Sequence, residues 1–416
     1  MRICLYTETA LPKLGGQEFV VDALARQFTS AGHEVVVLAP QPQTLWPAND
    51  SALPYHVQRH PKFFSMQRLV DWYRWWLLRC HRRFRFDILH CHGIYPPGYL
   101  ALLCRERLGV PIVITSHGGD IREGNNRLAR PELYCRFLRS LHGADALVAI
   151  SRFTRECLLR LCPSPRMLVD IPNGVDLQPF ARRAPRPANL DPTIQAGQYV
   201  LFLGRLKHRK GLDVLLEALS LIPPTGQVQL VVAGDGQENS SLKAQMSRLG
   251  LQSRIRFVSA VFGSDKIYLL QNALATVLPS RLADAGPLVV LESFAAGVPV
   301  IGTSVPGLED LIEEGKTGWL VPPESPIALA QALRQILSDP QLPRGLSEVV
   351  RQKVRDFSWP VVARRHLQLY ETLLSPQRTS ESIWHSDVEP MESGKSKIKN
   401  RGLAPILNLL SSVLFP

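Results

Sequence analysis

The sequence has no apolar run long enough to span a membrane, and no basic, apolar and small-residue signal sequence opens it. Its first residues, Met1 to Tyr6, instead have the apolar pattern of a strand. Cysteine is scarce, with seven residues in 416, all in the first half of the chain and none in a Cys-x-x-Cys pair. This odd, unpaired set favours reduced structural thiols over disulfides or a metal site, so we expect a cytoplasmic protein without a metal.

Charge is limited in amount and unbalanced in sign. Charged residues make up 20% of the chain and hydrophobic residues 45%, as in a folded globular protein of two or three domains. The net charge of +12 favours an anionic partner, which could be a phosphate-bearing substrate, a membrane surface or nucleic acid. Nucleic-acid binding needs basic residues interleaved with exposed aromatics, and only residues 66–83 offer them, so no nucleic-acid partner is expected.

Residues 275–301 predict a strand, a loop, a helix and a second strand. The first strand ends at Pro279, the helix begins near Pro287, and Gly297 ends it. Backbone N–H groups in the first turn of this helix, together with the helix dipole, would bind an anion such as a diphosphate. These groups are expected at residues 286 to 289, which include Gly286, Leu288 and Val289.

Two carboxylates flank this helix start, Asp284 in the loop and Glu292 inside the helix. An ionised carboxylate only accepts hydrogen bonds, and it therefore suits sugar hydroxyls, which can donate them. The plainer alternative is an acidic residue at a helix start together with a solvated glutamate.

The beginning of the chain predicts a parallel α/β unit, with strands at 2–7 and 34–40 and a helix at 18–31 between them. Gly15 and Gly16 precede that helix, so the backbone can approach a ligand closely there. The three-glycine spacing of a dinucleotide fingerprint is absent, and a mere turn is the alternative.

Further parallel strands are predicted at 86–90, 111–115 and 146–150. Ligands bind outside the carboxyl ends of such strands. His117 follows the second of these strands, before two glycines and near Asp120, and is therefore placed to touch a substrate. His92, after the first, is a weaker candidate, and a structural histidine is the alternative at either position.

The second half repeats this pattern after residues 177–198, a segment rich in Pro, Ala and Arg that predicts a linker. A strand is predicted at 199–204, followed by Arg205 and Lys210. A guanidinium and an ammonium at one mouth of a sheet suit phosphate oxygens, whereas solvated surface charge is the alternative.

Residues 66–83 predict a helix with two different faces. One face is apolar and is expected to pack on the sheet: Met66, Leu69, Val70, Tyr73, Trp76, Leu77 and Cys80. The other side mixes aromatic, apolar and basic residues: Trp72, Trp75 and Leu78 with Arg68, Arg79, Arg82 and Arg83. This mixture suits the headgroup zone of an anionic membrane, and burial under the loop at 62–64 is the alternative.

The C-terminal residues 375–416 are expected to lie outside the folded part. Residues 375–400 are polar and predict disorder, and basic residues from Lys395 precede an apolar end at 403–416. That end is too short to span a membrane; it could lie in a membrane interface, pack on the folded part or be unstructured. An anionic membrane surface is thus an expected partner through 66–83 and 395–416, with the protein peripheral on the inner face of the membrane.

Several of these features resemble the motifs of glycosyltransferase family 4, whose members are retaining enzymes with the GT-B fold. The resemblance extends to about residue 374 and is carried by the Gly15-Gly16 loop, Gly204-Arg205 with Lys210-Gly211, Ile171 to Asp176, and Asp284 with Glu292 before Ala-Ala-Gly-Val-Pro-Val. The family usually has Glu where this chain has Asp284.

The resemblance implies an α/β protein of two doubly wound, Rossmann-like parallel-sheet domains that face an interdomain cleft. Residues 1–176 would form the acceptor side, residues 199–356 would bind the nucleotide sugar, and helix 357–374 would return to the first domain. The resemblance also assigns a role to each site residue. His117 and Asp284 would act on the donor sugar as the catalytic residues, and Arg205 and Lys210 would bind the diphosphate. Glu292 would hold the ribose, and the backbone at Val261 would read the nucleobase.

The resemblance and the residues predict a hexosyltransferase that moves a sugar, with retention, from a nucleotide-diphosphate sugar to a glycan or lipid-linked acceptor in envelope, exopolysaccharide or glycolipid synthesis. No cofactor is expected, since cations and amides at the leaving diphosphate stabilise its charge and no Asp-x-Asp is placed for a metal. The alternatives are a nucleotide-sugar epimerase or phosphorylase of similar fold, and a non-catalytic nucleotide- or membrane-binding relic suggested by Asp284.

Overall fold

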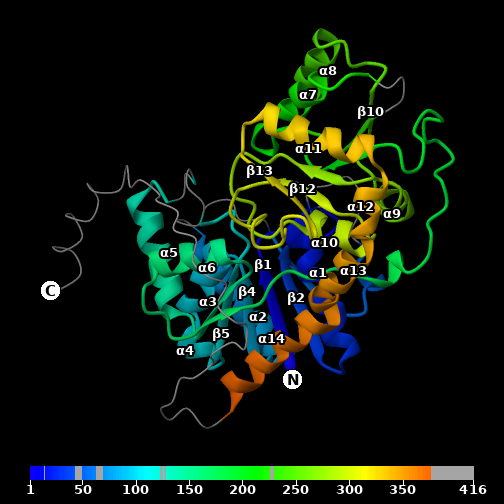
Figure 1. Ribbon diagram of the computed structural model, residues 1–416. Coiled ribbons are helices and arrows are strands. Elements are labelled where there is room, and N and C mark those ends of the chain that lie inside the picture. Colours follow the sequence, from blue (N-terminus) through cyan, green and yellow to red (C-terminus); the bar gives the residue numbers. More distant parts are fainter. Residues whose placement is uncertain are drawn as a thin grey trace. The chain divides into compact units, whose positions relative to one another are not determined.

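The computed structural model describes residues 1–13, 15–42, 49–61, 69–121, 125, 128–224 and 229–375, and residues 1–374 form one compact unit. Two parallel sheets with flanking helices organise this unit (Figure 1). The first sheet has seven strands in the order β3-β2-β1-β4-β5-β6-β7, and the second has six in the order β10-β9-β8-β11-β12-β13. Every strand pair is parallel, so the doubly wound α/β prediction is confirmed.

The strands of the first sheet are β1 (Arg2–Thr7), β2 (Glu34–Pro40), β3 (His56–His60), β4 (Ile88–His92), β5 (Ile112–Ser116), β6 (Ala146–Ala149) and β7 (Leu168–Asp170). Those of the second are β8 (Val200–Leu203), β9 (Leu230–Ala233), β10 (Ile255–Val258), β11 (Thr276–Leu278), β12 (Val300–Thr303) and β13 (Gly318–Val321). Each order reverses beside its first strand, between β1 and β4 and between β8 and β11. Ligands of open α/β sheets bind at the carboxyl ends of the strands at such reversals.

The helices in the first part of the chain are α1 (Gly16–Ser30), α2 (Val70–Phe84), α3 (Tyr99–Leu103), α4 (Arg105–Leu108), α5 (Pro131–Gly143) and α6 (Arg152–Leu161). Those that follow are α7 (Leu212–Ser220), α8 (Asn239–Arg248), α9 (Gly263–Gln271), α10 (Leu288–Ala295), α11 (Pro326–Ser338), α12 (Gln341–Gly345), α13 (Ser347–Val354) and α14 (Trp359–Leu374). No helix of the described residues is both long enough and apolar enough to cross a membrane.

Both faces of each sheet are buried, which explains why the central strands are apolar throughout instead of alternating with polar residues. Successive side chains of a strand point to opposite faces. In β1, Ile3 and Leu5 pack with α1 and α14, whereas Cys4 and Tyr6 belong to the cluster that includes buried residues of α2. The helices therefore cover the two faces as the periodicity requires.

Helix α14 returns to the first sheet and lies beside α1 (Figure 1). Its Tyr370 hydroxyl lies 2.6 Å from Nδ1 of His90, a fully buried residue of β4. The segment that leads into α14 runs next to the segment that leaves the first sheet. Val175 N–H donates to Phe357 O at 2.8 Å, and Trp359 N–H donates to Val175 O at 3.2 Å. The two crossings between the sheets are thus joined by main-chain hydrogen bonds.

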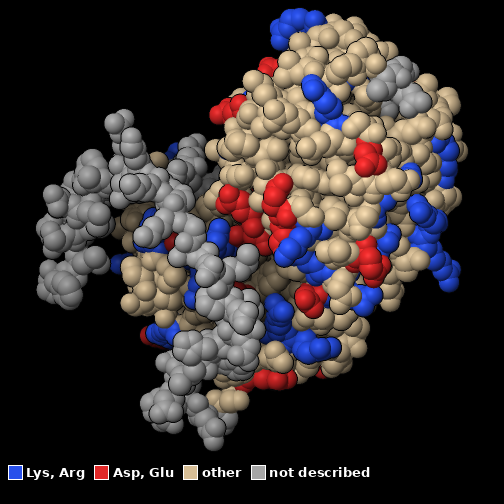
Figure 2. All heavy atoms as spheres, viewed as in Figure 1, with Lys and Arg blue, Asp and Glu red and all other residues tan. Residues whose placement is uncertain are grey.

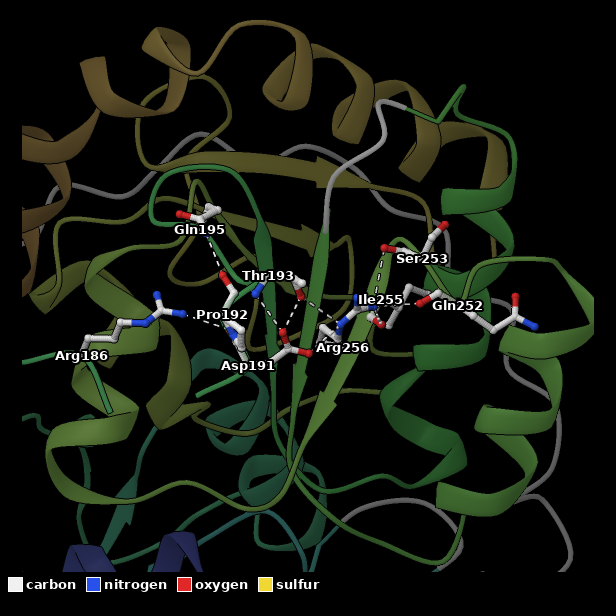
Figure 3. A network of polar contacts seen from close by, with 9 residues as sticks. All are labelled: Arg186, Asp191, Pro192, Thr193, Gln195, Gln252, Ser253, Ile255 and Arg256. Carbon is white, nitrogen blue, oxygen red and sulfur yellow. Dashed lines mark hydrogen bonds and ion pairs between the residues drawn. The ribbon is translucent and has the colours of Figure 1, made fainter. Parts of the chain in front are cut away.

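The segment 177–198, predicted as a linker, is bound along part of its length to the second sheet (Figure 3). Arg256 of β10 donates from Nε to Asp191 Oδ2 at 2.8 Å. Arg186 donates to the Ile194 carbonyl at 2.9 Å and to the Tyr268 hydroxyl at 3.2 Å. These bonds hold part of residues 177–198 in place, although their composition predicted a linker.

Helix α2 confirms one predicted face and corrects the other. Tyr73, Leu77 and Cys80 are buried, while Trp72 and Trp75 are 40% and 43% exposed. The prediction for Leu78 was wrong, because this residue packs on the first core cluster instead of lying with the two exposed rings. Residues 66–68 and the loop at 62–64 lie outside the described residues, as do the tail residues 376–416.

Basic and acidic side chains are interspersed on the face that Figure 2 shows. The formal charge of +12 is therefore not gathered into a single basic patch on this face.

Candidate functional site

A cavity of about 480 Å³ lies at the carboxyl ends of the strands where both sheets reverse. The segments that follow strands of the first sheet contribute Glu8, Gly16, Gln17, Gly93, Tyr95, His117, Gly119, Asp120, Asn125, Ile150 and Asn173. The loop and helix start after β11 contribute Asp284, Ala285, Gly286 and Leu288. The structure thus brings His117, Gly16, Asp284, Gly286 and Leu288, predicted from distant parts of the sequence, into one site.

Glycines allow the loops of the two sheets to approach each other at this cavity. Gly118 has a φ of +80°, and a Cβ atom on it would lie 2.1 Å from the Cβ atom of Ala285. Asn173, which is buried, donates from Nδ2 to the Gly286 carbonyl at 3.0 Å. The loop after β5 and the helix start after β11 are therefore in direct contact, which places His117 and Asp284 on the same cavity.

Gly15 and Gly16 stand at the start of α1, which begins at Gly16, and Gly15 lies close to Arg205, which follows β8. A Cβ atom at Gly15 would lie 2.4 Å from Glu18 Oε2 and 2.9 Å from Arg205 Nη2. The absence of a side chain at Gly15 thus leaves room for the Arg205 guanidinium beside the first-sheet loop. At Gly16 a Cβ atom would be in ordinary van der Waals contact with Leu288, at 3.9 Å.

His117 is held by a second histidine. Its Nε2 lies 3.0 Å from Nδ1 of His92, and the two rings are stacked. His92 is fully buried at the end of β4, and Gln17 Nε2 donates to its carbonyl at 2.9 Å. This hydrogen bond holds the His117 ring in place at the cavity wall, so the weaker candidate His92 supports the stronger one.

Burial keeps these histidines neutral. Burial, with a smaller effect from the neighbouring His366, lowers the pKa of His117 to about 4. Burial also lowers the pKa of His366 to about 4 and holds the pKa values of His90 and His92 well below the usual range. At neutral pH, His117 therefore presents an uncharged imidazole to a ligand, and it can donate or accept one hydrogen bond there.

Asp284, which lines the cavity, forms an ion pair with Lys210. Lys210 Nζ donates to Asp284 Oδ2, and both side chains are largely buried. Burial alone would raise the pKa of the Asp284 carboxyl, but Lys210, assisted by the charge of Arg209, outweighs burial and holds the pKa below its usual range. Asp284 is therefore an anion, and Oδ1 remains able to accept a hydrogen bond from a ligand hydroxyl.

The start of α10 offers backbone donors beside this pair. Within the described residues, no hydrogen bond is formed by the N–H groups of Gly286, Leu288 and Val289. Pro287, which lies between them, has no N–H group to add. Three N–H groups at the positive end of a helix dipole still form a site for an anion.

Six of the predicted residues are not among those that line the cavity: Gly15, Arg205, Lys210, Val261, Val289 and Glu292. Glu292 pairs with Lys266 of α9 at 2.7 Å, Val261 packs on the apolar cluster below the loop that precedes α9, and the Val289 side chain packs between two core clusters. Glu292 and Val261 therefore belong to a neighbouring part of the second sheet, on the side of α9. Val289 can reach a ligand only through its backbone.

Several residues of the cavity wall were not predicted from the sequence: Glu8, Gln17, Tyr95, Asn125, Asn173 and Ala285. Glu8 and Asn173 follow strands of the first sheet, so their position relative to strand ends was a usable signal. The same signal applied to Tyr95, which follows β4, whereas Asn125 lies farther from the end of β5 and gave no such signal. Among the side chains that the structure describes, no group of three or more His, Cys, Asp or Glu residues could hold a metal ion.

Two family descriptions match the chain in sequence. Residues 14–179 match "Glycosyltransferase Family 4", and residues 193–353 match "Glycosyl transferases group 1". A phosphatidyl-myo-inositol mannosyltransferase of Mycolicibacterium smegmatis is 30% identical over 388 residues, which is 90% of this chain and 94% of that protein.

Solved structures show the same fold. Sucrose-phosphate synthase from Thermosynechococcus elongatus superposes with a TM-score of 0.74 at 24% identity and covers 89% of this chain and 98% of its own. Anabaena HepE in complex with UDP also has a TM-score of 0.74, at 17% identity. The match covers 90% of this chain and 100% of the HepE chain.

The neutral histidines predict how stability depends on pH. Their pKa values are lower in the folded chain than the ordinary value of about 6.5, so the unfolded chain binds more protons between pH 6.5 and 4. Stability should be independent of these groups above pH 7. It should fall by about 1.4 kcal/mol per pH unit for each such histidine as the pH drops toward 4.

Urea unfolding at pH 7.5, 6.5, 5.5 and 4.5 measures this slope. The H117Q variant should show a shallower slope than the wild type, because it loses one of the titrating groups. Asp310 acts in the opposite sense, since burial raises the pKa of its carboxyl despite Arg152. Asp284 and Asp213 act in the same sense as the histidines at the acid end of the range, because their pKa values are held below the usual range. A free energy of unfolding that stays constant from pH 6.5 to 4.5 would contradict this account.

Proposed function

The chain belongs to glycosyltransferase family 4 and is a glycosyltransferase with the GT-B fold, and we propose that it moves a sugar, with retention, from a nucleotide-diphosphate sugar to a glycan or lipid-linked acceptor. Family membership supports the proposal of retention. The donor and the acceptor are inferred from the site and from what its relatives are named for. The M. smegmatis relative is a phosphatidyl-myo-inositol mannosyltransferase, and Anabaena HepE is in complex with UDP.

One observation carries the proposal: a cation and three backbone N–H groups converge beside Asp284 at the carboxyl end of β11. This combination suits a diphosphate, whose oxygens accept hydrogen bonds from the ammonium and from the helix start. Lys210 has three N–H donors and uses one for Asp284, so the others are available to phosphate oxygens. Arg205, across the mouth of the cavity, would add a second cation.

The same arrangement explains how the site would accelerate transfer. Negative charge grows on the leaving diphosphate as the bond to the sugar breaks, so donors aimed at it stabilise the transition state more than the bound substrate. Asp284 would accept a hydrogen bond from a sugar hydroxyl, and the neutral His117, which lines the same cavity, would also contact the sugar. The ion pair with Lys210 keeps the Asp284 carboxylate charged and oriented for that contact.

The acceptor would approach from the first-sheet side of the cavity. The wall there carries polar groups that can bind hydroxyls of a sugar or polyol ring: Glu8, Gln17, Tyr95, Asp120 and Asn125. Asp120 is itself oriented by Ser116, whose hydroxyl donates to Oδ1 at 2.5 Å, and by the Ile94 N–H group at 3.1 Å. A fixed carboxylate of this kind can orient an incoming hydroxyl.

A lipid-linked acceptor would bring the protein to a membrane, and α2 has a surface suited to that contact. Trp72 and Trp75 are exposed, and the Arg79 guanidinium lies 5.4 Å from the Trp75 ring centre. Arg82 and Arg83 are exposed at the end of the same helix. Amphipathic rings and cations together favour the headgroup region of an anionic bilayer.

The first test concerns the diphosphate contacts. K210A and R205A should each lower turnover by about two orders of magnitude, the usual loss when one transition-state contact is removed. D284N should also lose activity, whereas D284E should keep it, because the carboxylate and not its length makes the contact. Steady-state kinetics with a panel of nucleotide sugars measures both effects.

The matched control is K207A, which removes an exposed cation from the same loop and should leave turnover near the wild-type value. Wild-type turnover in both K210A and R205A would contradict the proposed diphosphate site. Incubation with donor alone adds a check, since an epimerised or phosphorolysed sugar formed without acceptor would favour an epimerase or phosphorylase.

The second test concerns the membrane. Full-length protein should sediment with vesicles that contain anionic lipid, and this binding should weaken with salt, since each Arg near such a surface contributes about 1 kcal/mol that ions screen. Changing Trp72 and Trp75 to Ser, with R79E and R82E, should reduce binding. Changing the exposed Ile327 and Leu342 to Ser, away from α2, is the matched control and should not.

A chain that ends at Ser375 separates the contribution of α2 from that of the tail. Full-length protein that does not bind anionic vesicles at low salt would contradict the membrane proposal and leave a soluble sugar acceptor.

A further inference from the structure

Arg281 is a largely buried arginine three residues after β11, with a side chain that is 12% exposed. It does not line the cavity. Its guanidinium forms a bidentate pair with Asp213 of α7, from Nη1 to Oδ1 at 2.7 Å and from Nη2 to Oδ2 at 2.6 Å. Burial alone would raise the pKa of the Asp213 carboxyl, but the bonds from Arg281 outweigh burial and hold that pKa below its usual range. The pair is therefore ionised in the folded protein.

The same arginine also binds the backbone of the loop that carries Lys210. Its Nη1 donates to the His208 carbonyl at 2.8 Å, and its own backbone N–H donates to the Arg209 carbonyl at 2.9 Å. These two carbonyls belong to the short helical turn η4 (His208–Lys210). Arg281 thus contacts both η4 and the first turn of α7, on either side of Gly211.

The loop has little freedom to move away from this contact. Gly211 has a φ of +67°, and a Cβ atom on it would lie 1.9 Å from the Pro279 carbonyl, so the loop is seated directly on the end of β11. Lys210 then reaches from η4 to Asp284 on the cavity side. Arg281 fixes the backbone on one side of the loop, and Lys210 projects from the other.

We infer that Arg281, paired with Asp213, is a positioning residue that holds the Lys210 loop in the geometry needed to bind the donor diphosphate. This inference rests on the proposed function, since it gives Arg281 its effect through Lys210. A guanidinium can bind a carboxylate through two parallel bonds and still donate to a carbonyl, whereas the ammonium of a lysine cannot reproduce that planar fork.

The two carboxylates that pair with Arg281, Glu324 and Asp213, should contribute unequally to holding it in place. Glu324 also accepts from Arg281 Nε, at 3.0 Å, but its side chain is 68% exposed, and exposed pairs contribute little. Asp213 is better shielded, at 32% exposed, and its pair is bidentate. D213N should therefore have the same effect as R281Q, and E324Q should behave like the wild type.

The test measures binding by calorimetry for UDP, GDP and ADP, each compared with its nucleoside. With whichever diphosphate binds, R281Q and K210A should each weaken affinity about tenfold or more, the scale of a lost charge-assisted contact. Binding of the nucleoside alone should not change. R281K should recover part of the loss at most, because the charge is kept but the fork is not.

The double variant R281Q/K210A distinguishes a positioning role from a general structural one. If Arg281 acts through Lys210, the double variant should bind no more than about twofold more weakly than K210A alone, because coupled effects do not add. R256Q is the matched control: it removes an arginine whose network with Asp191 and Thr193 lies elsewhere on the second sheet (Figure 3). It should lower stability without changing the affinity for the diphosphate.

Independent, multiplicative losses in the double variant would overturn the inference, as would an equal loss of affinity for the nucleoside in R281Q. Normal affinity in R281Q and D213N, together with a loss in K210A, would overturn this inference alone. Normal affinity in K210A, or no binding of any diphosphate to the wild type, would overturn the proposed function and this inference with it.

Discussion

The ion pair between Lys210 and Asp284 is the interaction on which the rest of the site depends. Two largely buried charges are tolerated only when they are paired, and removing one would leave the other uncompensated. The pair joins the loop after β8 to the loop after β11, the two strands at which the second sheet reverses. It therefore fixes the relative position of the cation, the carboxylate and the free N–H groups of α10.

Close packing between loops completes the site. Gly118 has no side chain to keep the loop of His117 away from Ala285, and Asn173 binds the Gly286 carbonyl. The histidine chain on the first sheet, from His90 to His92 and His117, is buried and neutral. One wall of the cavity thus carries uncharged and acidic groups, and the other carries the cation and the helix start. A donor with a charged diphosphate and a neutral sugar would match this division.

Much of the architecture could be predicted because it depends on local patterns. Buried parallel strands are short apolar runs, and glycine or proline marks their ends, so most strands were found within two residues. The strand predicted at 86–90 is Ile88–His92, since Asp87 binds Arg2 at the strand start, and this shift puts His92 in the sheet. Strand β3 was missed because its sequence, His-Val-Gln-Arg-His, is polar, as is common at a sheet edge.

The candidate site could be predicted only in part. His117, Asp284, Gly16 and Lys210 stand next to strand or helix ends, where sequence gives a signal. Arg281 gave none, because its partners Asp213 and His208 are distant in sequence and become neighbours only when β8 and β11 pair. The error at Leu78 has a similar cause: periodicity assigns a face, but the core cluster beneath α2 is wide enough to reach that residue.

The central claim is that the cavity binds a diphosphate through Lys210 and the start of α10. Thermal and urea unfolding with UDP, GDP or ADP, each against its nucleoside monophosphate at equal concentration, tests it most directly. A diphosphate at a hundred times its Kd should raise the free energy of unfolding by about 3 kcal/mol, the monophosphate should do less, and the advantage should disappear in K210A. Equal stabilisation by mono- and diphosphates, or none by either, would contradict the claim.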